Sequence, residues 1–374
     1  MAPLPLRFCL DLSYHAWARA ADSAAAVART IEVARVADKA GVDSLWVSED
    51  PDGWDAFALL GALARETAHV RLGPGVANPY LRHPNLLAAS VATLDRLSGG
   101  RAFLGLGRGQ TEWYAHAFGM EVGKPVEVLE ETFALLRQWW APPYLASSVG
   151  HFAVQEWERT IGPFQAAPPV YLAAVGPRAL DLAARHADGV LFNDLASDAF
   201  LAEAIAAVRA GAAAAGRDPA RLEFYVRAGV TVTDDPEPVL ERKKTYLALV
   251  NALPGMERLM ATPDFDVPGI VAEVRRLMRT EDILARGGGF PALRRSGGLA
   301  AARAAIPTDL VARLAVVGPL SHVRARLRAL ASLGASHVFV ASPTPGQTAA
   351  TYRTALAALV AEETSAGFPD SAVG

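Results

Sequence analysis

Acidic and hydroxyl side chains stand where two short apolar segments of the sequence end. Asp11 closes the segment RFCLD, and Ser48, Glu49 and Asp50 follow the segment DSLWV. Clustered carboxylates repel one another, so at least one of these acids is expected to have a raised pKa. A single acid at such a point is usually a helix N-cap. Three acids together favour proton transfer, which makes Asp11, Glu49 and Asp50 the candidate catalytic residues.

Glycines break two further apolar segments abruptly. The first break, in LGPGVANPYLRHP, falls at Gly75 and Val76, and the second, in RAFLGLGRGQTEW, falls at Gly107 and Gly109. A lone Pro-Gly pair usually marks a turn that faces solvent. The position of these breaks relative to the other segments therefore decides whether they belong to a site.

A fifth segment runs into a helix through a turn that suits an anion. In PVYLAAVGPRALDLAARHADGV the apolar strand leads to Val175 and Gly176, Pro177 takes the first helical position, and Arg178 adds a positive charge. The free N–H groups and the positive dipole end of such a helix bind phosphate groups. An ordinary strand-to-helix turn that is capped by water is the alternative.

Short apolar segments of β type alternate with longer segments of helical period along most of the chain. This alternation predicts parallel strands that are joined by right-handed helical crossovers. Eight such units predict a (β/α)8 barrel of the α/β class, whose functional groups lie at the strand C-termini. A doubly wound open sheet is the alternative. The eight predicted strands are RFCLDL, DSLWVS, VRLGPGV, RAFLGLG, PVYLAA, GVLFN, EFYVRAGVTV and SHVFVA.

Two segments are longer than the connections of a minimal (β/α)8 barrel require. We therefore predict that residues 1–374 form one domain in which these two segments are insertions. Residues 141–169 contain several prolines and the short run HFAVQEW, which suggests an excursion with a hairpin. Residues 251–306 suggest a mostly helical insertion with a Gly/Arg loop, RGGGF. No strand precedes this loop and no GK[ST] follows it, so a linker or a lid hinge is preferred over an anion site.

Composition narrows the class of protein. The chain has 374 residues, 52% of them hydrophobic, and a net charge of −3, which gives no strong field for nucleic acid or an anionic membrane. Its single cysteine, Cys9, excludes an internal disulfide, and no metal-binding spacing such as HExxH or paired CxxC occurs. The N-terminus lacks the pattern of a signal peptide, and no apolar run is long enough to span a bilayer. We therefore expect a cytoplasmic protein with no metal that acts on a small molecule.

The blocks GVANPYLRHP, RAFLGLGRGQTEW, EVLEETFALLRQWW and PVYLAAVGPRALDLAARHADGVLFN together resemble the bacterial luciferase-like family of flavin- and deazaflavin-dependent oxidoreductases. Within that family they are most similar to the methylenetetrahydromethanopterin reductase branch, which uses coenzyme F420. The likeness covers roughly residues 6–195 closely and the segment VVGPLSHVRARLRALASLGASHVFVAS more loosely. It implies a TIM barrel and a bulge after the third strand with a non-prolyl cis peptide at Gly75-Val76, against the central ring of the cofactor.

The resemblance also implies roles for single residues. Asp11 falls where a carboxylate lies near the pterin and protonates its nitrogen before hydride transfer. Family members often have Asp-His after the second strand, whereas this chain has Glu49-Asp50, which makes a simple alcohol or sugar-phosphate substrate less expected. The cofactor-binding residues are expected to be Ser48 and Glu49 at the polar edge of the ring, Gly75, Val76 and Asn78 in the bulge block, Gly107, Arg108, Gly109 and Gln110 beside the ring and ribityl chain, and Ala174, Val175, Gly176, Pro177 and Arg178 at the phosphate.

Three functions follow as alternatives. The first is an F420-dependent oxidoreductase acting on a conjugated small molecule, the second an FMN-dependent monooxygenase served by a partner flavin reductase, and the third a non-catalytic flavin-binding barrel. The oligoglutamate tail of F420 needs positive charge beyond the phosphate turn, and Arg108, Arg178, Arg82 and Arg185 are candidates. Trp46, Trp54 and Trp113 either stack on a flat substrate or pack internally. A homodimer or higher homo-oligomer is expected.

Overall fold

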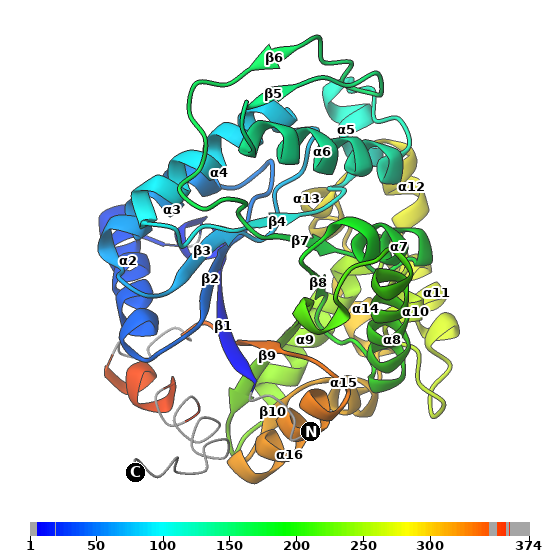
Figure 1. Ribbon diagram of the computed structural model, residues 1–374. Helices are drawn as coiled ribbons and strands as arrows, with labels where there is room; N and C mark the ends of the chain where they lie inside the picture. The colour runs from blue at the N-terminus through cyan, green and yellow to red at the C-terminus, as the bar shows by residue number, and fades with distance from the viewer. Residues whose placement is uncertain (1–5, 19, 344–349, 357–358, 360–374) are drawn as a thin grey trace.

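Eight parallel strands form a barrel in the computed structural model, which describes residues 6–18, 20–343, 350–356 and 359 (Figure 1). The order of hydrogen-bonded neighbours is β3-β2-β1-β11-β9-β8-β7-β4. The predicted (β/α)8 class is confirmed, and all eight predicted segments contain a barrel strand. These strands are β1 (Arg7–Leu12), β2 (Ser44–Val47), β3 (Arg71–Pro74), β4 (Leu104–Leu106), β7 (Val170–Ala173), β8 (Gly189–Phe192), β9 (Glu223–Val232) and β11 (His337–Val340).

The two ends of that strand order meet between β3 and β4, which closes the barrel. Isolated parallel bridges join Leu72 to Ala102 and Ala77 to Leu106. The N–H of Ala77 donates to the carbonyl of Gly105 at 2.9 Å. A short strand, β10 (Val317–Gly318), pairs with the far end of β9. The closed ring excludes the open doubly wound sheet.

Helices follow the strands and cover the outside of the barrel (Figure 1). Their starts are set by local side chains: the carboxylates of Asp22 and Asp55 and the hydroxyl of Ser197 each accept a first-turn N–H. Gly99 ends α4 in the left-handed conformation, at φ 69°. The helices of this layer are α2 (Ser23–Lys39), α3 (Ala56–Glu66), α4 (Pro84–Ser98), α6 (Pro125–Trp140), α7 (Pro177–His186), α8 (Asp198–Ala214), α9 (Glu237–Val250) and α16 (Leu320–Ser332).

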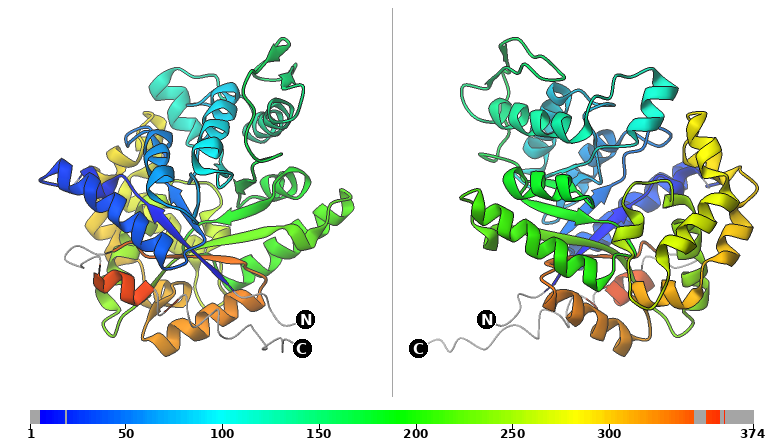
Figure 2. Two further views of the ribbon diagram at one scale, coloured as in Figure 1. Left: turned by 60° about the vertical axis from the view of Figure 1, so that its left-hand side comes forward. Right: turned by 90° about the vertical axis from the view of Figure 1, so that its right-hand side faces the viewer.

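Both expected insertions are present. A two-stranded antiparallel hairpin, β5 (Leu145–Ala146) and β6 (Trp157–Glu158), projects from the barrel next to α6 (Figure 1). A layer of short helices stands beside the barrel between β9 and β10 (Figure 2, yellow and orange). These are α10 (Met256–Leu259), α11 (Val267–Met278), α12 (Thr280–Ala285), α13 (Phe290–Arg294), α14 (Leu299–Ala305) and α15 (Thr308–Leu314). Shorter connections contain α1 (His15–Ala18), α5 (Thr111–Phe118) and the 3-10 helix η1 (Pro219–Arg221). In the described part of the chain no helix has the length and apolarity to cross a membrane.

Large side chains fill the middle of the barrel. Trp46 is fully buried there, and its ring lies 4.4 Å from the ring of Phe103 and 5.0 Å from that of Tyr225. Trp46 therefore packs the core and cannot stack on a ligand at either end. The whole plug consists of Cys9, Trp46, Phe103, Tyr171, Leu191, Tyr225 and Phe339.

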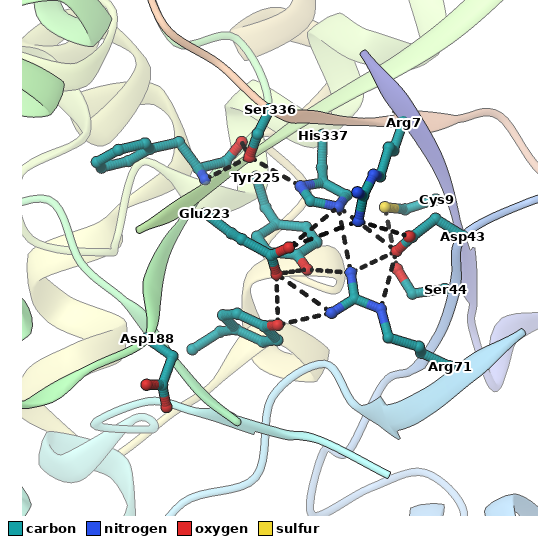
Figure 3. Close-up of polar contacts among 12 residues, drawn as sticks. Arg7, Cys9, Asp43, Ser44, Arg71, Asp188, Glu223, Tyr225, Ser336 and His337 are labelled. Atoms are coloured by element: carbon teal, nitrogen blue, oxygen red, sulfur yellow. Dashed lines mark hydrogen bonds and ion pairs between the residues drawn. The ribbon is translucent and has the colours of Figure 1, made fainter. Parts of the chain in front are cut away.

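A charged network closes the N-terminal end of the barrel (Figure 3). Arg71, the first residue of β3, donates to the carboxylate of Asp43 at 2.5 Å and to the hydroxyls of Tyr171 and Tyr225 at 2.7 and 2.8 Å. Glu223 also accepts from Arg71 at 3.2 Å. Because these donors and acceptors satisfy one another below the plug, the open chemistry of the molecule lies at the opposite, C-terminal mouth.

Candidate active site

Small residues form a floor at the C-terminal mouth. Val76 and Ala173 pack directly on the aromatic plug. Gly107 lies against Val76 so closely that a Cβ at Gly107 would fall 2.6 Å from the Val76 side chain. The peptide bond between Gly75 and Val76 is cis, as the resemblance implied. Small, mostly apolar residues that follow β3, β4 and β7 therefore form the floor of the mouth, and such a surface suits the face of a ring system.

Two of the predicted acids meet at the other side of this floor. Asp11 is the penultimate residue of β1 and Asp50 follows β2, and the charge of Asp11 helps to raise the pKa of Asp50. Burial raises the pKa of Asp11, and the nearby Arg227 cation opposes this shift. Burial, and next the charge of Asp52, raise the pKa of Asp50 to about 6, with Asp11 contributing and Arg227 opposing. Asp50 can therefore hold a proton up to about pH 6, and such a carboxyl group could deliver it to a substrate.

Unsatisfied polar atoms gather on this side of the mouth. Oδ1 of Asp11, Oγ of Ser48 and Nε of Arg227 are buried, and none has a hydrogen-bond partner among the described residues. The Asp11 side chain as a whole remains 31% exposed. Other buried atoms of the described chain also lack partners, among them Nε of Arg303 and Arg326, but these three atoms lie together at the mouth, where a ligand could satisfy them.

Arg227 was not anticipated from the sequence. It lies on β9 at the inward position above Tyr225 and donates to the carbonyl oxygen of Gly75 at 2.6 Å. Its Nη1 lies 3.5 Å from Oδ2 of Asp11. The available signal was a single arginine inside EFYVRAGVTV, two residues after an inward tyrosine, where an apolar side chain would be expected.

Glu49, the third predicted acid, forms an ion pair with Arg82. Its Oε1 accepts from Nε of Arg82 at 2.6 Å, and Arg82 also pairs with Asp55 at 2.8 Å. Burial nevertheless raises the pKa of Glu49 despite Arg82. Its Oε2 is buried without a partner among the described residues. One oxygen of Glu49 is thus left for a ligand, whereas Arg82 is already engaged.

The loops after β3 and β4 are ordered by their own side chains. Oδ1 of Asn78 accepts the N–H groups of Tyr80 and Leu81 at 3.1 and 3.0 Å, so this predicted residue shapes the loop. Gly109 adopts φ 63°, and a Cβ there would fall 2.7 Å from Tyr114. The other predicted residues of this loop differ in their engagement: Gln110 precedes α5 without capping it through its side chain, and Arg108 pairs with Glu112 at 3.0 Å.

The turn after β7 has the features predicted for a phosphate site. Gly176 precedes α7, and Pro177 is the first residue of that helix. The N–H groups of Val175, Gly176 and Arg178 have no acceptor in the described part of the chain, whereas Ala174 donates to Leu191 at 3.4 Å. A Cβ added to Gly176 would meet nothing within 4 Å. The helix start therefore presents free donors to open space, as an anion requires.

The helical insertion reaches the loops of the mouth. The ring of Phe290, in α13, lies 4.8 Å from the ring of Trp113 after β4. At the other end of α13, Arg294 lies 3.1 Å from Nε2 of His15 after β1, and its charge acts on Asp50. The insertion thus borders the site at the loops after β1 and β4. Trp113 is packed against the insertion and buried.

A closed (β/α)8 barrel with buried acids, a floor of small residues and a turn of free N–H groups at its C-terminal mouth has the arrangement typical of barrel enzymes. The chain belongs to the luciferase-like monooxygenase family, whose model matches residues 7–337. It is an oxidoreductase, which excludes the non-catalytic alternative.

Several relatives are similar over most of their length. A 5,10-methylenetetrahydromethanopterin reductase of Methanolobus tindarius is 28% identical over 324 residues, which cover 85% of this chain and 91% of that protein. A putative coenzyme F420-dependent oxidoreductase of Mycobacterium tuberculosis is 29% identical over 336 residues, 83% and 89% of the two chains. The structure of the coenzyme F420-dependent tetrahydromethanopterin reductase of Methanopyrus kandleri has a TM-score of 0.73 at 21% identity and covers 94% of this chain and 98% of that one, which supports the shared fold.

Proposed function

We propose that this enzyme binds coenzyme F420 at the C-terminal mouth and transfers a hydride between the deazaflavin and a small conjugated substrate, with a methylenetetrahydropterin as the first candidate. The observation that supports this most is the pairing of a floor of small, mostly apolar residues with a rim of unsatisfied polar atoms and a turn of free N–H groups. The relatives named above support the choice of F420. The deazaflavin supplies the hydride when it is bound.

The residues at the mouth would have different roles in binding the cofactor and in holding a proton. Val76 and Ala173 would support one face of the ring system, and the N–H groups of Val175 and Gly176 would bind the phosphate. Asp11 and Asp50 lie on the open side and would hold the proton that a substrate nitrogen takes up. Ser48 Oγ and Glu49 Oε2 would bind the polar edge of the ring, since both atoms are otherwise without partners among the described residues.

The second candidate is an FMN-dependent monooxygenase that receives reduced flavin from a partner reductase. One observation favours it: of the four arginines considered for the F420 tail, three are paired within the protein. Arg82 pairs with Glu49, Arg108 with Glu112 and Arg185 with Asp181. Only Arg178 is exposed and without an ion-pair partner among the described residues. FMN ends at one phosphate and needs no further cation.

A parallel titration tests the proposal. F420 and FMN are added separately to the protein, and binding is followed by the fluorescence of the cofactor. We expect F420 to bind at least about tenfold more tightly than FMN. Tighter binding of FMN, together with oxygen consumption in the presence of reduced FMN, would establish the monooxygenase instead. Turnover of a panel of methylenetetrahydropterins with reduced F420 then tests the substrate class.

A further inference from the structure

Arg227 links two parts of the mouth that come from distant points of the chain. One prong of its guanidinium, Nη2, donates to the Gly75 carbonyl at 2.6 Å, and the other, Nη1, faces Oδ2 of Asp11 at 3.5 Å. The cation also lies over the ring of Phe339, 5.5 Å from its centroid. These three contacts come from β1, from the residue that follows β3 and from β11, and the Arg227 side chain remains 23% exposed.

The remaining atoms of this cluster indicate that it is more than internal packing. Nε of Arg227 and Oδ1 of Asp11 are both buried, and neither has a partner in the described part of the chain. The Arg71 network at the opposite end satisfies its donors and acceptors. An unpartnered arginine Nε also occurs at Arg326, so the acid is the stronger sign: among the described residues, the buried carboxylate oxygens without a partner belong to Asp11 and Glu49, both at the mouth. The Arg227 cluster leaves one donor and one acceptor open at the floor of the site.

We propose that Arg227 is a positioning residue of this site, which ties the Asp11 carboxyl group to the Gly75 carbonyl on one guanidinium and so holds the proton donor at the level of the floor. The inference rests on the proposed function for the identity of the cofactor, but the link itself belongs to the ligand-free protein. A planar fork with two donors is needed for this geometry, and a lysine ammonium cannot reproduce it.

Several charged and titratable groups face the two acids, and Arg227 is the cation that acts on both. Around Asp50 these are Asp52, Arg294, Tyr14 and Tyr114, and Tyr246 of α9 faces Asp11 and Arg227. Arg227 favours the ionised form of Asp11, so its loss removes an attraction and the pKa of Asp11 must rise. The basic limb of any activity that uses protonated Asp11 would move to higher pH.

The test is a carboxyl ¹³C NMR titration of the ligand-free protein labelled at aspartate, with the Asp11 signal assigned by its loss in Asp11→Asn. We expect Arg227→Met to raise the titration midpoint of Asp11 by about one pH unit. Arg227→Lys keeps the charge, so its shift should be less than about half as large. Arg326→Met is the matched control, because Arg326 forms a paired contact with Asp198 outside the mouth at 2.8 and 2.9 Å.

Cofactor affinity separates positioning from a purely electrostatic role. Both Arg227→Met and Arg227→Lys should bind F420 about tenfold more weakly, because neither holds the carbonyl of Gly75, next to Val76 of the floor, as the guanidinium does. An unchanged Asp11 midpoint in Arg227→Met overturns the proposal, and so does wild-type F420 affinity in Arg227→Lys. If Arg227→Met does not fold, the proposal is tested by Arg227→Lys alone, which should show a small shift of the Asp11 titration midpoint and weaker binding of F420. If wild type binds no F420, the proposed function fails, while the Asp11 titration still decides the role of Arg227.

Discussion

Asp11 is the residue at which the proposed chemistry can be tested most directly. Its side chain is partly open to the mouth, its pKa is raised by burial, and it has one unsatisfied oxygen. We expect Asp11→Asn to keep its cofactor affinity and to lose about 10²- to 10⁴-fold in kcat, because an amide cannot donate the proton. Steady-state kinetics beside a binding titration measures both.

Asp198→Asn serves as the control for that substitution. Asp198 also pairs with an arginine, Arg326, but lies at the start of α8 on the outside of the barrel. It should lose stability without losing turnover. Full turnover by Asp11→Asn would contradict its role as a proton donor and leave it as a structural group.

Asp50 should make the stability of the protein depend on pH. Its pKa is about 6 in the folded state and about 3.8 as the ordinary value, so the folded protein holds an extra proton between these values. Because the folded state binds this proton more tightly than the unfolded state, the free energy of unfolding contributed by Asp50 decreases as pH rises from about 4 to above 6. We expect Asp50→Asn to match wild type near pH 4 and, discounted for partial exposure, to be about 1–2 kcal/mol more stable at pH 7.5. Urea unfolding at both pH values measures this, and an equal gain at both would contradict it.

At the scale of elements, the start of α7 carries the next prediction. Gly176 faces open space, so Gly176→Asp should fold normally while its carboxylate repels a bound phosphate. We expect cofactor affinity to fall about 10- to 100-fold. Gly176→Asn is the matched control, since it adds similar bulk without charge and should weaken binding less. Unchanged affinity in a folded Gly176→Asp protein would move the phosphate to another part of the mouth.

The elements themselves were predictable because their signals are local. The helix start at Gly176-Pro177 follows from backbone preferences within two residues, and the eight strands follow from apolar runs of a few residues each. The contacts that complete the mouth and the base of the barrel are not local. Arg227 and Gly75 are 152 positions apart, and Arg71 and His337 are 266 positions apart. The sequence shows an arginine in an apolar strand but contains no local signal for the carbonyl that it binds.

At the scale of the whole molecule, the two ends of the barrel differ in whether their buried polar and charged groups have partners. At the mouth, Asp11, Ser48 and Arg227 each keep a buried polar atom without a partner among the described residues. At the base, Arg71 and Tyr171 donate to Glu223, and Arg71 also donates to Asp43. Burial of Asp43 opposes its ionisation, but His337 and Arg71 lower its pKa, so its charge is retained and paired. Function is expected at the first end and stability at the second.

This division predicts different outcomes for two arginines that contact the same acids. Arg71 and Arg7 both face Asp43 and Glu223, but their side chains are 24% and 60% exposed. Arg71→Met leaves buried carboxylates and hydroxyls unpaired, so we expect a loss of about 3 kcal/mol in the free energy of unfolding. Arg7→Met removes a solvent-screened pair and should cost less than about 1 kcal/mol. Urea unfolding measures the two losses. Under conditions in which Arg71→Met remains folded, its cofactor affinity should equal that of wild type, because the aromatic plug separates the base from the mouth; a large affinity loss would show that the two ends are coupled.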